Sequence, residues 1–442
     1  MEAAGSRLHD KLPASRNLRI ILWTLIFLAS AEFIVRGPVR FLNGPSNWND
    51  LSQNYTASKL WLKGQSPSDP RNFVALWKYE SGSRLELTDI RTHLAPPLGG
   101  LVVLAPVAVF PWKIAKILWL AVLLTAFVAT VWALVRASSF PWNDTRTLAF
   151  IAACLALAPF QTGIGSGNPS ILVIGLCPVA IWAAQRRSDI AAGILFGMAC
   201  SMKPQLGAFL VLYYLVRRRW QLFMTAVAST AALNLVAVLY LQLRGTSWIQ
   251  DYLRNAKGFI AANPIDDFST LNPSRFTLIN LQVPFFSITG HSSSANLLAM
   301  VVGGVLLCAW VYWVWQSPAD RAEILPLATV SVLSLLPVYH RFYDAALLVL
   351  PLCWCVAIAV AQPRTIAKIA LLLMTPFLVP GTAFLQQVAA HGKVPDSFTQ
   401  SWLWNCIVMP HETWALLLLG LVLLYGMKSE ATGQSEEYAV PT

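Results

Sequence analysis

Charged residues are scarce in this sequence. Asp, Glu, Lys and Arg together make up 12% of its 442 residues, whereas hydrophobic residues make up 56%. A soluble domain usually carries about twice that share of charge. Apolar runs of about 18 residues or more, each long enough to cross about 30 Å of hydrocarbon, recur along almost the whole chain. The composition therefore excludes an ordinary soluble enzyme and predicts an all-α polytopic membrane protein.

Several catalytic signatures are also missing. The sequence contains no Walker A motif, no GxSxG, no HExxH and no Cys/His cluster, which argues against a nucleotide-driven pump, a serine hydrolase and a zinc protease. The seven cysteines all lie in or at the edge of apolar segments, at Cys154, Cys177, Cys200, Cys308, Cys353, Cys355 and Cys406. We interpret them as small buried hydrophobic residues rather than as disulfide partners.

The basic residues do not form a nucleic-acid-binding face, although the formal net charge is +11. They fall in short clusters between apolar runs, at 136–146, 185–187, 217–219, 320–321 and 364–368. Lys and Arg are enriched in the cytoplasmic loops of membrane proteins. We therefore expect the protein to contact membrane lipids and no nucleic acid.

The same clusters orient the expected crossing segments. The tail 1–17 is polar and basic, so the N-terminus should be cytoplasmic, and the first apolar helix begins at about residue 18. Further candidate spans cover 114–135, 147–163, 169–184, 190–202, 205–216, 222–243, 297–315, 324–338, 342–360, 366–384 and 406–424.

One apolar segment, 98–110, is too short for an ordinary span. If it crossed the membrane, every later basic loop would lie outside; if it dips in or lies flat, all of them face the cytoplasm. The second option predicts a bundle of about twelve transmembrane helices with both termini cytoplasmic. The transmembrane domain would cover 18–427, with a first outer loop at 37–113 that carries surface or re-entrant helices, a second outer loop at 244–296 and a polar cytoplasmic tail at 428–442.

The first outer loop holds a candidate catalytic residue, Asp50, near the mouth of the first helix. A carboxylate at the hydrocarbon boundary can act as general base on an acceptor hydroxyl. Asp50 can also cap the surface helix expected over 49–63, and the two roles do not exclude each other. Asn54 and Tyr55 follow it in that helix. His93 closes the loop before two prolines, where a structural role is the alternative to substrate binding.

Two later turns place cations at the expected outer face. Lys203 lies between two apolar helices joined by almost no loop, and an ionisable group at that depth is typical of a functional site. Anion binding and a lysine that snorkels from a helix end both remain open. His340 and Arg341 stand in an aromatic turn with Tyr343 and can hold a phosphate through charge-assisted hydrogen bonds. The alternative is a self-satisfied cluster in which Asp344 pairs with Arg341.

Two polar turns give weaker signals. The glycine-rich turn 163–169 contains Asn168 and ends near a helix start, where exposed N–H groups favour anions. It lacks the lysine of a P-loop, so a tight re-entrant turn is the alternative. Asp266 and Asp267 form a carboxylate pair in the second outer loop. Because no third ligand is arranged beside them, we expect a solvated turn rather than a metal site.

Short motifs follow one another in a defined order along residues 49–351. They are Asp50 with Tyr55 and Gly64, Ala95-Pro96-Pro97-Leu98, Pro106 through Trp119, Gly167-Asn168-Pro169, Ala192-Gly193 through Gly197 to Lys203-Pro204, Arg217-Arg218-Arg219-Trp220 and His340. Together they resemble glycosyltransferase family 87. Two departures stand out: the glycine turn reads Gly-Asn-Pro where Gly-Gln is more usual, and the late motif Tyr-His-Arg-Phe-Tyr-Asp lacks a tryptophan.

This resemblance implies a GT-C-fold enzyme that takes a hexose such as mannose from a polyprenyl-phosphate carrier and passes it, with inversion, to a hydroxyl of a glycolipid or envelope glycan. It gives Asp50 the catalytic position and leaves Lys203, His340 and Arg341 to bind the donor phosphate. The candidates for substrate binding are Asn54, Tyr55, His93, Asn168 and Tyr343. An activated phosphate ester needs stabilisation of its departing charge more than it needs a metal, so no metal or other cofactor is expected. The site should face outward from the inner or plasma membrane.

A second hypothesis is a secondary transporter or flippase for a lipid-linked saccharide, which twelve spans would also suit. Transporters commonly show repeated halves and interrupted helices in matching positions, and the sequence shows neither. A long first outer loop that carries an acid favours the enzyme.

Overall fold

The computed structural model describes residues 16–44, 49–82, 97–254, 266–317, 323–361 and 365–432. Within these ranges the chain is built from helices, and an isolated antiparallel bridge between Leu278 and Arg341 stands in place of any strand. The prediction of an all-α protein is confirmed for the part of the chain that the structure describes.

Five helices are long and apolar enough to cross a membrane. They are α1 (Arg16–Ile34) with its continuations η1 (Val35–Val39) and α2 (Arg40–Asn43), α6 (Trp112–Ala137), α12 (Trp220–Leu243), α15 (Ser292–Gln316) and α21 (His411–Ala431). Two bent groups also qualify if each is one span: α7 (Thr145–Ala156) with α8 (Ala158–Ser166), and α18 (Thr365–Met374) and η5 (Thr375–Leu378) with α19 (Gly381–Ala390). Pro159 and Pro380 stand at the two breaks, because proline cannot continue the helical hydrogen bonding.

Shorter apolar helices coincide with most of the remaining expected spans. They are α9 (Ser170–Gln185), α10 (Asp189–Met202), α11 (Pro204–Val216), α16 (Ile324–Leu333) and η4 (Phe342–Leu348) with α17 (Val349–Ala361), whereas α5 (Leu98–Ala108) covers the segment that is expected not to cross. The 13 residues of α11 cover only about 20 Å at 1.5 Å per residue. Length and composition therefore support five to seven spans in the described part of the chain, and the expected count of about twelve is not confirmed. The prediction of a multi-pass membrane protein is confirmed.

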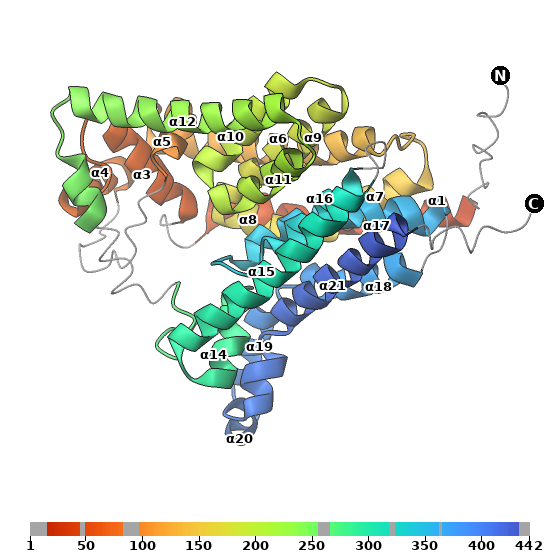
Figure 1. The fold of residues 1–442 in the computed structure, drawn as a ribbon. Coiled ribbons are helices and arrows are strands. Elements are labelled where there is room, and N and C mark those ends of the chain that lie inside the picture. Colours follow the sequence, from red (N-terminus) through yellow and green to blue (C-terminus); the bar gives the residue numbers. More distant parts are fainter. Residues whose placement is uncertain are drawn as a thin grey trace, which may run out of the picture.

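The connections between these helices gather at two ends of the bundle. At one end, which we call the basic end, Arg219 pairs with Asp189 and lies 3.6 Å from Glu323, while Arg217 donates to the carbonyl of Ser317 at 2.8 Å. The start of α1 and the end of α21 lie at this same end (Figure 1). Loops that the sequence assigns to the cytoplasm thus meet one another in space.

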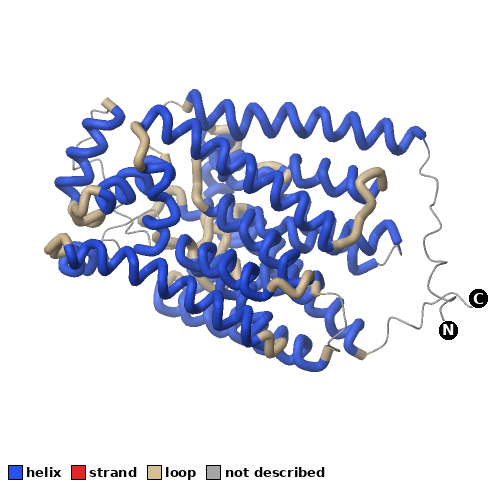
Figure 2. The backbone as a smooth tube through the Cα atoms, turned by 90° about the horizontal axis from the view of Figure 1, so that it is seen from above, coloured by secondary structure: helices blue, strands red, loops and turns tan. Residues whose placement is uncertain are grey.

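The opposite end, which we call the loop-rich end, carries the small helices. Here α3 (Asp50–Leu62) packs with α4 (Pro70–Ser81) and with α5, which lies along α12. A separate group, α14 (Gln282–Thr289) and α20 (Asp396–Thr399) with η3 (Arg275–Thr277) and η6 (Trp404–Val408), lies beside α15 and α19, and Figure 1 shows α14 and α20 at the bottom of the view. Trp61 Nε1 donates to the Ala237 carbonyl at 3.1 Å, and the Tyr240 hydroxyl donates to the Leu62 carbonyl at 2.9 Å. Figure 2 shows the long helices running side by side between the two ends.

Both ends of α5 belong to the loop-rich half of the molecule. At its start, the Gly99 N–H donates to Asn234 Oδ1 at 3.0 Å. After its end, the Phe110 carbonyl accepts a hydrogen bond from Lys59 of α3 at 3.0 Å. The segment 98–110 therefore does not run the length of the bundle.

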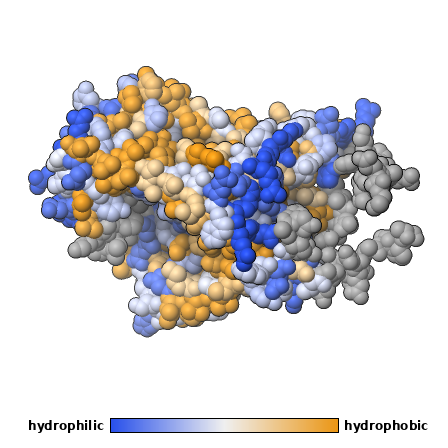
Figure 3. Space-filling view, turned by 45° about the horizontal axis from the view of Figure 1, so that its top comes forward, coloured by the Kyte–Doolittle hydropathy of each residue, from blue (hydrophilic) through white to orange (hydrophobic). Residues whose placement is uncertain are grey.

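Hydrophobic residues cover much of the outer surface, with a band of strongly hydrophilic residues across one part of the face in Figure 3. The outer helices α1 and α12 expose large apolar side chains, among them Trp23, Phe27 and Leu235. Patches of this kind are rare on soluble monomers and mark a surface that meets lipid or another protein.

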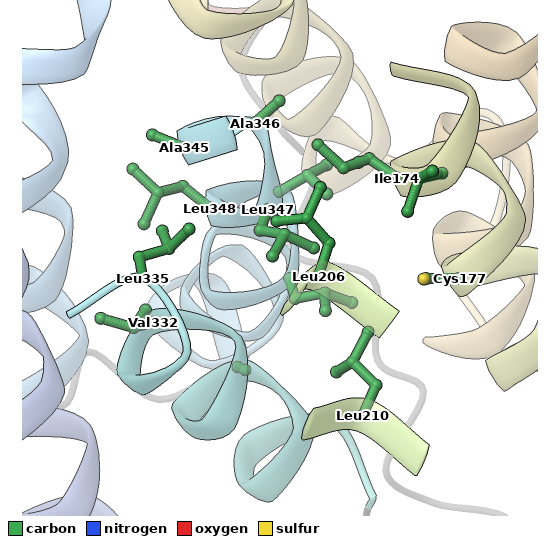
Figure 4. Close-up of a cluster of buried hydrophobic side chains, with 14 of the residues drawn as sticks. Ile174, Cys177, Leu206, Leu210, Val332, Leu335, Ala345, Ala346, Leu347 and Leu348 are labelled. Carbon is green, nitrogen blue, oxygen red and sulfur yellow. The ribbon is translucent and has the colours of Figure 1, made fainter. Parts of the chain in front are cut away.

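The interior is a continuous apolar core. Figure 4 shows part of it, where Ile174 of α9, Leu206 of α11, Val332 of α16 and Leu347 of η4 come together. All seven cysteines are free and five are fully buried, which agrees with their interpretation as hydrophobic residues, although Cys308 is exposed. This packing fixes the relative positions of the turns that carry the polar residues described next.

Candidate active site

Four segments that are far apart in the sequence meet at the loop-rich end of the core. They are the start of α3, the turn between α8 and α9, the break between α10 and α11, and the turn between α16 and η4. Gly167 shapes the second of these: its φ of +68° is left-handed, and a Cβ there would lie 2.5 Å from the Phe41 ring. Only glycine accommodates both conditions easily.

Asp50 opens α3 but does not cap it. The cap is Asn49, whose Oδ1 accepts from the Ser52 N–H at 3.0 Å, while Ser52 Oγ accepts from the Asn49 N–H at 2.9 Å. The Asp50 carboxylate is partly exposed, and its Oδ2 accepts from Asn168 Nδ2 at 2.8 Å. The N-cap alternative is thus wrong for Asp50, and its side chain is directed at a residue from a distant turn.

Asn168 links Asp50 to the rest of the site. Its Oδ1 accepts from the Ser170 N–H at 2.8 Å, so the amide is held in one orientation. The Ser170 hydroxyl in turn donates to Asp344 Oδ1 at 2.7 Å. A continuous hydrogen-bonded path therefore runs from Asp50 to Asp344 through the glycine-rich turn.

Asp344 is the centre of this polar cluster and is fully buried. Its Oδ1 accepts from Lys203 Nζ at 2.6 Å, and its Oδ2 contacts His340 Nδ1 at 3.1 Å and the Arg341 N–H at 3.2 Å. A buried carboxylate needs several such partners to offset the loss of water. Sequence reasoning treated Asp344 only as a possible partner for Arg341 and did not propose it as a site residue, although its spacing of four residues from His340 was visible.

Lys203 is directed into the protein. Its ammonium bonds both Asp344 and the Ser170 hydroxyl, the latter at 2.8 Å, and lies 5.0 Å from the centre of the Tyr343 ring. Its side chain is 15% exposed, so the lysine does not snorkel to the surface. Its charge is balanced by Asp344, which makes it a fixed part of the cluster.

Arg341 stands on the side of the cluster that faces Asp50. Its Nε donates to the Tyr339 hydroxyl at 2.6 Å, whereas Asp344 contacts its backbone N–H. Burial alone would lower the pKa of Arg341, but neighbouring groups, among them Tyr339 and Asp50, raise it. The guanidinium and the Asp50 carboxylate are therefore electrostatic neighbours.

His340 is fully buried. Its Nδ1 faces Asp344, and its Nε2 has no hydrogen-bond partner among the described residues. The imidazole thus contacts Asp344 through Oδ2, whereas Lys203 contacts Oδ1.

Other candidates lie apart from this cluster or outside the described residues. Asn54 stays next to Asp50, because its Nδ2 donates to the Asp50 carbonyl at 2.7 Å. The Tyr55 hydroxyl instead donates to Glu80 Oε2 at 2.8 Å, and Glu80 pairs with Lys59 at 2.9 Å. This second cluster ties α3 to α4. His93 lies outside the described residues.

The carboxylate pair of the second outer loop separates into two roles. Asp267 accepts from the Ser269 N–H and hydroxyl, both at 2.7 Å, and so closes its own turn as expected. Asp266 faces the site, where its carboxylate interacts with the Tyr339 hydroxyl. Burial raises the pKa of Asp266, and Tyr339, Arg341 and Lys203 reverse only part of that rise. Among the residues that the structure describes, no group of His, Cys, Asp and Glu could hold a metal ion.

Comparison with known proteins gives one match. The model of glycosyltransferase family 87 matches residues 96–338, just over half of the chain. That stretch includes Asn168, Lys203, Asp266 and the cores of α6 to α16, while Asp50 and the turn after residue 338 lie outside it. No curated protein and no solved structure matches the chain. A membrane-spanning helical bundle with a polar cluster at one end is consistent with this match, and the chain is a membrane glycosyltransferase that belongs to glycosyltransferase family 87.

Proposed function

We propose that the protein transfers a hexose, mannose-like in shape, from a polyprenyl-phosphate carrier to a hydroxyl of a lipid-linked or envelope glycan, with inversion at the anomeric carbon. The observation that carries the proposal is the Asp50 carboxylate, which is partly exposed, held by Asn168 at 2.8 Å and in electrostatic interaction with Arg341. A carboxylate held in one place and a cation that interacts with it electrostatically are the two groups that this transfer needs.

The reaction assigns one charge to each side of the sugar. Asp50 accepts the proton of the acceptor hydroxyl as its oxygen bonds to the anomeric carbon. The bond from that carbon to the phosphate oxygen breaks, and its electron pair leaves with the polyprenyl phosphate. Arg341 stabilises the additional negative charge on the departing phosphate, a role to which the planar guanidinium is suited.

Lys203 and His340 support this arrangement from within. Both contact Asp344 rather than the Asp50 side of the site, so we assign them to the donor-phosphate side as residues that hold Asp344 and the turn carrying Arg341. Asn54, Asn168 and Tyr343 lie close enough to Asp50 or Lys203 to contact substrate. Electrostatic stabilisation by these groups replaces any need for a metal in the proposed mechanism.

We further propose that the loop-rich end faces outward and the basic end faces the cytoplasm, with both termini inside the cell. This assignment follows the enrichment of Lys and Arg on the cytoplasmic side. It requires the shorter helices α9, α10, α11, α16 and η4–α17 to cross as well, because each connects one end of the bundle to the other. About twelve crossings then result, and the donor's prenyl chain stays in the outer leaflet.

The decisive experiment incubates the purified protein with synthetic polyprenyl-phosphate hexoses and a glycolipid extract, and measures release of polyprenyl phosphate. Asp50→Asn preserves size and removes the base, so we expect kcat to fall by about 10²–10⁴-fold. Asp396→Asn in the exposed helix α20 is the matched control and should leave the rate unchanged.

Two results would count against the proposal. Unchanged release in Asp50→Asn would remove Asp50 from the mechanism. Absence of release with every donor, together with movement of lipid-linked saccharide across proteoliposomes, would favour the transporter or flippase.

A further inference from the structure

The Tyr339 hydroxyl connects two charged groups of opposite sign. It accepts a hydrogen bond from Arg341 Nε at 2.6 Å, and the Asp266 carboxylate lies beside it as the acceptor available for its proton. A phenol has one proton, so donation to Asp266 leaves an oxygen lone pair for Arg341. The three residues form a directed chain from the second outer loop to the candidate phosphate-binding cation.

The rest of Arg341 is fixed independently. Its backbone N–H donates to Asp344 at 3.2 Å, and its backbone forms the antiparallel bridge with Leu278. The neighbouring Ile279 N–H donates to the His340 carbonyl at 3.0 Å. With the backbone held in this way, the contact at Nε restricts how the plane of the guanidinium is turned.

Tyr339 and the segment that carries Asp266 are anchored by apolar packing. Tyr339 and Phe268, two residues after Asp266, pack against the cluster formed by Phe276, Leu278, Val283, Trp404 and Met409. The Asp266 carboxylate is consequently held in a place where burial raises its pKa. Ionised groups kept in unfavourable surroundings occur preferentially at functional sites.

We infer that Asp266 is a positioning residue that acts through the Tyr339 hydroxyl to orient the Arg341 guanidinium toward the donor phosphate. The inference rests on the proposed function and adds to it a contribution of the second outer loop. Asp266 does not touch the substrate. It keeps the Tyr339 proton away from Arg341, so that the guanidinium presents the same edge in every catalytic cycle.

The test is a set of double-mutant cycles on the purified full-length protein. Asp266→Asn weakens the acceptor for the Tyr339 proton, and Tyr339→Phe keeps the ring and removes the hydroxyl. We expect each to lower kcat/KM for the polyprenyl-phosphate donor by about tenfold, with KM for the acceptor unchanged. Double variants that combine these two substitutions with each other, or either of them with Arg341→Lys, should lose no more kcat/KM than the more severe single variant. The effects of substitutions at residues that act as one unit are not additive.

Asp267→Asn is the matched control, since Asp267 closes a turn beside Asp266 without contacting Tyr339. Additive losses, or equal effects of Asp266→Asn and Asp267→Asn on donor kcat/KM, would overturn the inference.

A binding experiment separates this inference from the proposed function. Undecaprenyl phosphate serves as the probe, and its affinity is measured for the wild type and the same variants. Retained binding without any transfer contradicts the proposed function alone, and about tenfold weaker binding in Asp266→Asn and Tyr339→Phe then still supports the positioning role. Equal affinity in all variants, or no binding by the wild type, contradicts it.

Discussion

At the scale of single residues, the buried carboxylate of Asp344 determines the layout of the site. Full burial of a charge is unfavourable unless opposite charge and hydrogen bonds surround it. Lys203, Ser170 and His340 come from three different turns to meet that need. The same contacts hold those turns together, so the stability of the cluster and the shape of the site have a common origin.

Removal of one member of the Lys203–Asp344 pair should therefore be worse than removal of both. Lys203→Met and Asp344→Leu each leave a buried charge without its partner, and we expect each to lower the free energy of unfolding by about 3–5 kcal/mol. The double variant should lose less than either single variant. Thermal unfolding in detergent measures all three, and strictly additive losses would show that the two charges do not depend on each other.

At the scale of helices, small residues permit the contact that positions Lys203. Gly193 and Gly197 of α10 face α12, and a Cβ at Gly197 would lie 2.4 Å from Ser229 Cβ and 2.9 Å from the Ala226 carbonyl. Glycines four residues apart are a common device for close packing of membrane helices. Because Lys203 follows the last residue of α10 directly, a shift of this helix moves the ammonium.

Gly197→Ala should consequently reduce stability and transfer together. The added methyl group meets backbone that cannot easily yield, and overpacking of this kind costs about 1–3 kcal/mol. Gly304→Ala in α15 is the matched control, because nothing lies within 4 Å of a Cβ there and alanine is the better helix former. Loss of thermal stability in both variants would indicate a general intolerance of alanine rather than the close α10–α12 contact.

At the scale of the whole molecule, the sequence predicted the helices better than it predicted their contacts. Apolar runs identify helices because hydrophobicity is a local property, and the surface helix that became α3 was visible in the same way. The sequence predicts Asp50, Asn168, Lys203 and Arg341 as candidate site residues from their chemistry and the turns that carry them, and the structure brings them to one end of the bundle.

The partners of those residues were less accessible from sequence. Asn49 rather than Asp50 caps α3, and Tyr55 bonds Glu80. Both contacts depend on how distant segments pack together, which the sequence alone does not reveal. The same holds for Tyr339, whose hydroxyl accepts a hydrogen bond from Arg341 Nε and interacts with Asp266 of the second outer loop. Long-range pairing of polar groups follows from tertiary geometry, and no local pattern encodes it.

The membrane topology gives the last prediction, and labelling of single cysteines tests it. Gln65 is exposed at the loop-rich end and Ser188 at the basic end, so each can carry a cysteine in a background where the exposed Cys308 is replaced by alanine. We expect a membrane-impermeant maleimide to label Gln65→Cys in intact cells and Ser188→Cys only after permeabilisation.

Three crossings separate the two positions if α6, the α7–α8 pair and α9 each span while α5 does not. An additional crossing by α5, or a re-entrant α7–α8 pair, would put both cysteines on the same side. Labelling of both in intact cells would therefore contradict the proposed topology, whereas the reverse pattern would turn the site toward the cytoplasm and exclude a donor in the outer leaflet.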